Sequence, residues 1–166
     1  MSKVTVRFVE EKDAPFVQKF ASESQVAMTC LLPNPYPENG GKEWVDFAIN
    51  SRKAKKSYSF SILFDGEFAG VISLIGLDKE NKSCNVGYWL GTPYWNKGIC
   101  TNAISEVIDF GFNKLGLKDI WAECLKENLP SIKVLEKNSF LEDREFTFDA
   151  GKFKGEKGIW YVLKKE

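Results

Sequence analysis

The chain contains no histidine, and its four cysteines are widely scattered, without a Cys-x-x-Cys pair. Histidine and closely spaced cysteine are the usual zinc ligands in proteins, and histidine is the usual base for a nucleophilic serine or cysteine. The sequence therefore argues against a metal centre and against Ser-His or Cys-His catalysis. Such scattered cysteines are typical of reduced, mostly buried thiols in a cytosolic domain.

Neither sign of charge is in excess, because 23 Lys and Arg residues balance 23 Asp and Glu residues. A nucleic-acid-binding domain normally carries a basic patch, and no basic run is present. The longest apolar stretch, residues 68–77, is about half of a membrane span, and the charged N-terminus lacks the apolar core of a signal peptide. We therefore expect a cytoplasmic protein without a nucleic-acid or membrane partner.

The length of 166 residues and the 43% share of hydrophobic residues are those of a globular domain. We find no repeat or linker, so we expect one domain over residues 1–166. A helix is expected to begin at Ala14 with Asp13 as its N-cap, and another over residues 42–55 with Phe47 in the core. Alternating apolar residues predict strands at residues 4–9, 58–64, 68–77, 118–124, 141–148 and 158–163.

The most informative stretch begins with the strand pattern of residues 86–90, which stops at Gly91. From Ile99 to Leu115 the apolar residues follow a helical period instead. A strand, a helix and the strand at residues 118–124 form a right-handed βαβ unit, so these two strands are expected to be parallel. Ligands of such units bind beyond the C-terminal ends of the strands, where the glycine-marked loop lies.

The loop has the features of a phosphate site, because the first turn of a helix presents unpaired N–H groups and partial positive charge. Lys97 adds a full charge, Gly98 allows close approach to the backbone, and the Thr101 hydroxyl can reach the same anion. A Walker loop is excluded because the lysine precedes the glycine, and a dinucleotide fingerprint because Gly91 and Gly98 stand alone. A simple turn without a ligand remains the alternative from these residues.

A later helix is predicted after residue 127, with Asn128 as N-cap, Pro130 in the first turn and Asn138 as a left-handed C-terminal cap. From these residues alone, Asn128 is a helix cap and has no further role.

Residues 94–101, Tyr-Trp-Asn-Lys-Gly-Ile-Cys-Thr, resemble the pyrophosphate loop of the GNAT superfamily of N-acetyltransferases, in the branch that acetylates ribosomal-protein N-termini. The pattern Asn128-x-x-Ser131-x-x-x-Leu135 is similar to the segment of that family that follows the second parallel strand. The resemblance covers nearly the whole chain. It implies the GNAT fold, an α/β (α+β) architecture with a mostly antiparallel sheet, one parallel βαβ pair and helices on both faces, and acetyl-CoA as co-substrate, with no metal.

The resemblance also implies roles for individual residues. Backbone amides of the loop hold the pyrophosphate, Asn128 binds the pantetheine arm, and Ser131 lies near the sulfur and supplies the leaving thiolate with a hydrogen bond. Backbone N–H groups near residues 88–90 are expected to stabilise the oxyanion where the parallel strands splay. The expected cofactor-binding residues are Trp89, Leu90, Trp95, Asn96, Lys97, Gly98, Ile99, Cys100, Thr101, Asn128, Ser131 and Lys133.

The general base is the open question, because Asn85 stands where this branch often carries glutamate. Glu123, near the end of the neighbouring strand, is the substitute we expect, although a carboxylate there is also typical of a solvated strand end. A water chain held by Asn85 and Tyr88 is the alternative, sufficient for an α-amine with a pKa near about 8. The expected catalytic set is Ser131, Asn85, Tyr88 and Glu123.

We therefore expect an enzyme that transfers acetyl to a primary amine, either a protein N-terminal α-amine or a small molecule. Because of Asn85 and of Leu135, where many GNAT enzymes outside this branch carry tyrosine, a catalytically degenerate acyl-CoA-binding module is the alternative. A plain α/β domain for another phosphate ligand is the third. Tyr36, in the proline-rich loop 31–41, is the expected substrate-binding residue if that loop is a lid rather than a packed connector. A monomer and a homodimer are both compatible with the sequence.

Overall fold

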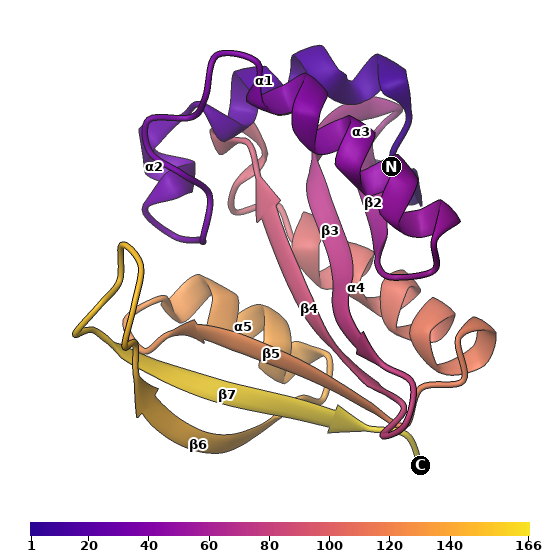
Figure 1. The fold of residues 1–166 in the computed structure, drawn as a ribbon, viewed down its shortest axis with the longest axis vertical. Coiled ribbons are helices and arrows are strands. Elements are labelled where there is room, and N and C mark those ends of the chain that lie inside the picture. The colour runs from indigo at the N-terminus through magenta and orange to yellow at the C-terminus, as the bar shows by residue number, and fades with distance from the viewer.

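The computed structural model describes residues 1–166, which form one seven-stranded sheet covered by helices on both faces (Figure 1). The strands are β1 (Val4–Phe8), β2 (Tyr58–Phe64), β3 (Glu67–Asp78), β4 (Ser83–Leu90), β5 (Asp119–Leu125), β6 (Leu141–Thr147) and β7 (Lys157–Lys164). Their order in the sheet is β1-β2-β3-β4-β5-β7-β6, and only β4 and β5 are parallel. The mixed sheet predicted from the sequence is confirmed.

The helices form two layers, each held to the sheet by its own apolar core. They are α1 (Ala14–Ala21), α2 (Ser24–Ala27), α3 (Gly40–Lys53), α4 (Ile99–Asp109), which continues in a π-helical turn over Phe110–Lys114, and α5 (Leu129–Lys137). Strand alternation sends Ile72 of β3 into the core under α4 and α5, and Val71 into the core under α1 and α3. No helix is both long and apolar enough to cross a membrane.

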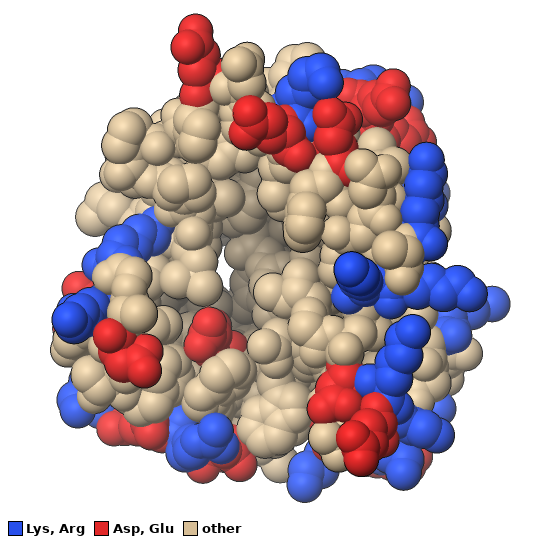
Figure 2. All heavy atoms as spheres, in the orientation of Figure 1, with Lys and Arg blue, Asp and Glu red and all other residues tan.

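Strands β4 and β5 separate soon after they meet. Their pairing ends at Asn85, opposite Trp121, while β4 continues along β3 to Leu90 and β5 continues along β7 to Leu125. Figure 1 shows the two halves of the sheet diverging from this point, and Figure 2 shows a hollow in the same place, bordered mostly by uncharged atoms. The expected splay of the parallel pair is therefore present.

Asp13 occupies the predicted N-cap position of α1, but its side chain does not cap that helix. Its side chain makes no cap hydrogen bond and is 2% exposed. The carboxylate instead accepts hydrogen bonds of 2.8 Å from both terminal nitrogens of Arg7 and one of 2.7 Å from the Ser61 hydroxyl. A buried charge requires such partners, and the one local bond of the carboxylate, from the Glu10 N–H at 2.9 Å, belongs to the turn before α1 and not to α1 itself.

Helix α3 begins earlier than predicted and turns Phe47 outward, so that its side chain is 63% exposed rather than in the core. The early start depends on Gly41, where a Cβ atom would lie 2.5 Å from the Ala14 carbonyl oxygen of α1. The Gly41 N–H donates to the Gln18 side chain at 2.7 Å. Contact between the two helices therefore sets the boundary, which local propensity cannot show.

Two further differences lie elsewhere in the chain. The short helix α2 was not predicted. After α5, Asn138 has a φ of −101°, and the left-handed position falls on Ser139 with a φ of +68°. The predicted C-terminal hairpin is present, with β7 inserted between β5 and β6.

Candidate active site

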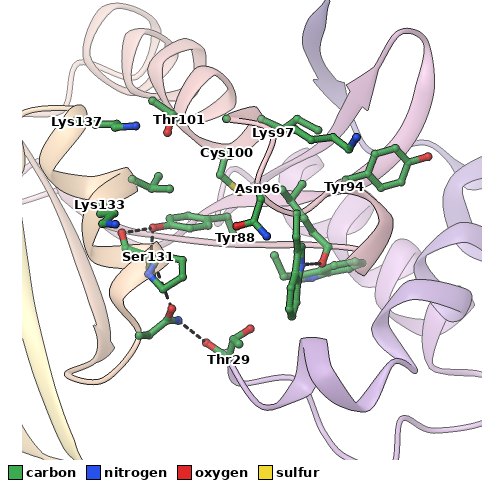
Figure 3. Close-up of a pocket in the computed structure, with 18 of the residues that line it drawn as sticks. Thr29, Tyr88, Tyr94, Asn96, Lys97, Cys100, Thr101, Ser131, Lys133 and Lys137 are labelled. Carbon is green, nitrogen blue, oxygen red and sulfur yellow. Dashed lines mark hydrogen bonds between the residues drawn. The ribbon is translucent and has the colours of Figure 1, made fainter. Parts of the chain in front are cut away.

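A cavity of about 510 Å³ lies between the N-terminal end of α4 and helix α5, beside the point where β4 leaves β5 (Figure 3). Every residue that the sequence predicts to bind the cofactor lines this cavity, together with Tyr88. The sequence-based prediction missed Thr29, Tyr94, Leu129, Pro130, Val134 and Lys137, which also line it.

The first turn of α4 is left open by the protein itself. Its N-cap is Gly98, in the left-handed conformation with a φ of +72°, and no side chain caps the helix. A glycine here avoids the steric cost that a Cβ atom brings to this conformation. The unpaired N–H groups of the first turn therefore remain available to an anion in the cavity.

The loop that leads into α4 is braced from two sides. The Glu23 carboxylate accepts hydrogen bonds from the Thr92 N–H at 3.0 Å and from the Thr92 hydroxyl at 2.5 Å. The Trp95 indole N–H donates to the Leu90 carbonyl at 2.9 Å. No local pattern could have identified Glu23, because it lies 69 positions before Thr92 in the sequence.

Lysines from two elements line the cavity that contains the open end of α4. Lys97 belongs to the loop, and Lys133 and Lys137 project from one face of α5, four positions apart. In Figure 3 the Lys137 side chain faces Thr101, whereas Lys97 extends toward Tyr94. The helix end and these cations together fit the phosphates of a nucleotide-containing substrate.

Tyr88 and Ser131 meet deeper in the cavity. The Tyr88 hydroxyl lies 2.8 Å from the Ser131 hydroxyl, and either oxygen can donate. Burial raises the pKa of Tyr88 well above its ordinary value, against the opposing effect of the Ser131 hydrogen bond. The phenol therefore stays protonated at neutral pH and can serve as a proton donor through Ser131.

The start of α5 is held in place by Asn128. Its side-chain oxygen accepts a hydrogen bond from the Ser131 N–H at 3.3 Å, so its predicted role as an N-cap is confirmed. Its side-chain nitrogen donates to the Thr29 carbonyl at 3.4 Å. Asn128 thereby connects the helix that carries Ser131 with a segment near the N-terminal end of the chain.

Backbone groups of β4 face the opening between the strands. The Gly91 N–H donates to the Ala69 carbonyl of β3, and alternation along a strand then directs the N–H groups of Leu90 and Tyr88 to the opposite side. Strand β5 no longer pairs with β4 at this level. These N–H groups are the backbone donors that an oxyanion in the opening could use.

Cys100 also lines the cavity, and burial raises the pKa of its thiol to about 12. The thiol therefore stays protonated at neutral pH, and a thiolate nucleophile is not expected at this position.

The remaining predicted site residues do not line the cavity. Asn85 occupies the last position at which β4 pairs with β5. Glu123 is exposed on the sheet face opposite the buried Cys124, and burial of its carboxyl by neighbouring groups raises its pKa. Tyr36 packs beside the core of α1 and α3, where its ring would lie 2.7 Å from a Cβ atom at Gly40. Their functional roles stay predictions.

The sequence profile of the acetyltransferase (GNAT) domain family matches residues 3–141. An uncharacterised N-acetyltransferase of Bacillus licheniformis is 28% identical over 143 residues, which are 85% of this chain and 80% of the relative. The putative ribosomal N-acetyltransferase YdaF of Bacillus subtilis is 28% identical over 144 residues, 84% of this chain and 79% of the relative.

Among solved structures, the ribosomal L7/L12 alpha-N-protein acetyltransferase RimL, in complex with coenzyme A, superimposes with a TM-score of 0.90. The match covers 97% of this chain and 93% of that chain, at 16% sequence identity. At this level of identity the likeness shows a shared fold.

Proposed function

The chain belongs to the GNAT acetyltransferase family as an N-acetyltransferase, and we propose that residues 1–166 act as a single domain that transfers acetyl from acetyl-CoA to a protein N-terminal α-amine or a small-molecule amine. One observation carries the proposal. The cavity joins an uncapped helix N-terminus and its lysines to the paired hydroxyls of Tyr88 and Ser131. A single ligand with phosphates at one end and a thioester at the other fits that combination.

We assign the pyrophosphate to the open first turn of α4, with Lys137 and Thr101 beside it. The pantetheine arm is then assigned to the groove along α5 near Asn128, and the thioester to the opening between β4 and β5. The lining of the cavity by residues of β4, α4 and α5 supports this path.

In the proposed reaction the amine nitrogen attacks the thioester carbon, a C–N bond forms and the C–S bond breaks. The N–H groups of Tyr88 and Leu90 stabilise the negative oxygen of the tetrahedral intermediate. Ser131 donates its hydroxyl proton to the departing sulfur, Tyr88 replaces that proton from its own hydroxyl, and water returns a proton to Tyr88 as the products leave. Burial raises the pKa of Tyr88, so its hydroxyl carries a proton before each turnover.

The amine approaches from the face opposite α4 and α5, where the hollow in Figure 2 lies. Glu123 is directed to that face by alternation along β5, because Ala122 and Cys124 point into the core under α4 and α5. Burial raises the pKa of Glu123, which makes its carboxylate a better proton acceptor than an ordinary glutamate. We therefore retain Glu123 as the proposed base, which takes a proton from the bound ammonium group so that the neutral amine can attack.

A thermal melt with acetyl-CoA, with ATP and NAD as controls, tests the binding half of the proposal. Acetyl-CoA at about 100 times its dissociation constant adds roughly 2.7 kcal/mol of stability and raises the midpoint by about 5–10 °C. A shift with acetyl-CoA alone supports the assignment, whereas an equal shift with ATP contradicts it.

Release of CoA in the presence of an alanine-initiated peptide, spermidine or an aminoglycoside tests the transfer half. Turnover with one of these amines supports the enzyme. Binding of acetyl-CoA without turnover of any amine would favour the alternative, a degenerate acyl-CoA-binding module, whose basis is Asn85 and Leu135.

A further inference from the structure

Two segments far apart in the sequence meet on the open side of the gap between the halves of the sheet. One is residues 27–32, which begin at the last residue of α2, and the other is the loop of residues 148–156 between β6 and β7. Figure 1 shows the yellow β6–β7 loop rising toward the indigo segment after α2. Helix α2 contacts α1, which packs on β3 in the half with β4, whereas the loop joins β6 to β7 in the half with β5, so this contact bridges the opening.

Lys152 makes the bridge. Its ammonium group donates hydrogen bonds to the Ala27 carbonyl and to the Leu32 carbonyl, at the two ends of the segment 27–32. It also lies 5.1 Å from the centre of the Phe153 ring, which is buried and packs at 5.7 Å against Phe148. A single cation therefore clamps both ends of the segment to a loop that is itself anchored by aromatic packing.

Lys152 is an exposed residue whose ammonium group forms no ion pair, so the two backbone carbonyls are its hydrogen-bond partners in place of a carboxylate. Partial burial of the ammonium group lowers the pKa of Lys152. A lysine that served only for solubility would keep its head group in water. The placement of Lys152 thus points to a structural task for its charge.

The clamped segment reaches the candidate active site through Thr29. Thr29 lines the cavity, and its carbonyl accepts the hydrogen bond from the Asn128 side chain. Asn128 in turn caps the helix that carries Ser131. Residues 27–32 are therefore held by hydrogen bonds from two side chains, that of Lys152 in the β6–β7 loop and that of Asn128 beside the cavity.

We propose that Lys152 is a positioning residue that keeps residues 27–32 closed over the opening between β4 and β5, so that this segment forms one wall of the acceptor path. The inference rests on the proposed acetyl transfer, because the segment contributes Thr29 to the cavity assigned to acetyl-CoA and is proposed to border the approach of the amine as well. Lys152 touches no reacting atom and acts only through the segment that it clamps.

Hydrogen exchange measured by mass spectrometry on the free protein tests the clamp without turnover. Lys152→Met keeps the length and packing of the side chain but removes its donors. We expect amides of residues 27–32 to exchange about tenfold faster in this variant, while those of α4 and the sheet core stay unchanged. Lys154→Met, at an exposed lysine of the same loop, is the matched control and is expected to leave the segment unchanged.

Steady-state kinetics with an alanine-initiated peptide and with spermidine test the acceptor role. Lys152→Met is expected to raise the KM of the accepted amine about tenfold, with the KM of acetyl-CoA and kcat changed less than about threefold. Equal exchange in the two variants would overturn the clamp, and faster exchange with an unchanged amine KM would overturn the acceptor role. If the wild-type protein turned over neither amine, both the proposed function and the acceptor role of the segment would be contradicted. The hydrogen-exchange comparison would still show whether Lys152 holds residues 27–32 in place.

Discussion

The Tyr88 hydroxyl lies 2.8 Å from the Ser131 hydroxyl, although the two residues are 43 positions apart and belong to β4 and α5. The contact exists because β4 leaves β5 at Asn85 and so exposes the side of β4 that carries Tyr88. The first turn of α5, fixed by the Asn128 cap, then places Ser131 opposite it. Opening of the sheet and capping of the helix together produce a pair of hydroxyls at the proposed thioester position.

Ser131→Ala should lower kcat by about 10²-fold with little change in the KM of acetyl-CoA, because it removes the group that donates to the leaving sulfur. Tyr88→Phe should cause a similar or smaller loss. Because the two hydroxyls act in series, the double variant should be hardly worse than Ser131→Ala alone. Independent, additive losses would contradict a shared proton path.

Glu123→Gln should lower kcat/KM for the amine by about 10²-fold or more, because it removes the proposed proton acceptor. In the wild-type protein, kcat/KM should rise with pH as Glu123 loses its proton, at a pH above the ordinary glutamate range since burial raises its pKa. The variant should lack that rise. Glu127→Gln, an exposed carboxylate of the following turn, is the control and should keep the wild-type profile. Unchanged activity of Glu123→Gln would instead favour a water chain at Asn85 and Tyr88.

Lys137→Ala should raise the KM of acetyl-CoA about tenfold without changing kcat, because Lys137 faces Thr101 at the open end of α4. Lys97→Ala should have a smaller effect, since its side chain extends toward Tyr94. Initial rates at two salt concentrations check that the effect is electrostatic. The difference in the KM of acetyl-CoA between the wild type and Lys137→Ala should shrink at high salt, because salt screens the charges. Lys53→Ala, at an exposed lysine of α3, should leave both constants unchanged.

Much of the site was predictable because its pieces are local. The strand, glycine loop and helix around Gly98 follow from a change of apolar period, and the Asn128 cap follows from residue type and position. The contacts between distant segments were not predictable. Glu23 reaches Thr92, and Lys152 reaches Ala27, only because the sheet topology brings their elements together.

The same reasoning accounts for the wrong assignments. Asp13 stands at the N-cap position before a helix, yet its buried carboxylate accepts hydrogen bonds from Arg7 and Ser61 and does not cap that helix. Phe47 is apolar and lies in an amphipathic helix, yet contact with α1 at Gly41 fixes a rotation of α3 that leaves it exposed. Local preferences are small, and tertiary contacts override them where the two conflict.

Asp13→Asn should destabilise the protein by about 3 kcal/mol at pH 7, because it leaves Arg7 without its buried charge partner. Burial alone would raise the pKa of Asp13, but hydrogen bonds from Arg7, the Glu10 N–H and Ser61 outweigh it, and the pKa falls below its ordinary value. The stabilisation is therefore full above the unfolded pKa of about 3.9 and disappears as the pH falls through the lower folded value.

Urea unfolding of the wild type and Asp13→Asn at pH 7 and at strongly acidic pH checks this prediction, since the difference between them should shrink in acid. Lys12→Met is the control, because Lys12 forms only an exposed ion pair, at 3.3 Å, with Glu10. Its cost should be below about 0.5 kcal/mol. A difference for Asp13→Asn that stayed constant with pH would contradict the electrostatic origin.

Ser139→Gly should stabilise the protein by up to about 1 kcal/mol, because Ser139 adopts the left-handed conformation, at a φ of +68°, where a Cβ atom is unfavourable. The greater freedom of glycine in the unfolded chain offsets part of this gain. The midpoint of thermal unfolding should therefore rise by about 2–4 °C. Asn138→Gly is the matched comparison, since Asn138 has a negative φ and its side chain donates to the carbonyls of Thr101 and Val134. That variant should lower the midpoint, and a rise for Asn138→Gly with a fall for Ser139→Gly would show that Asn138, not Ser139, occupies the left-handed position after α5.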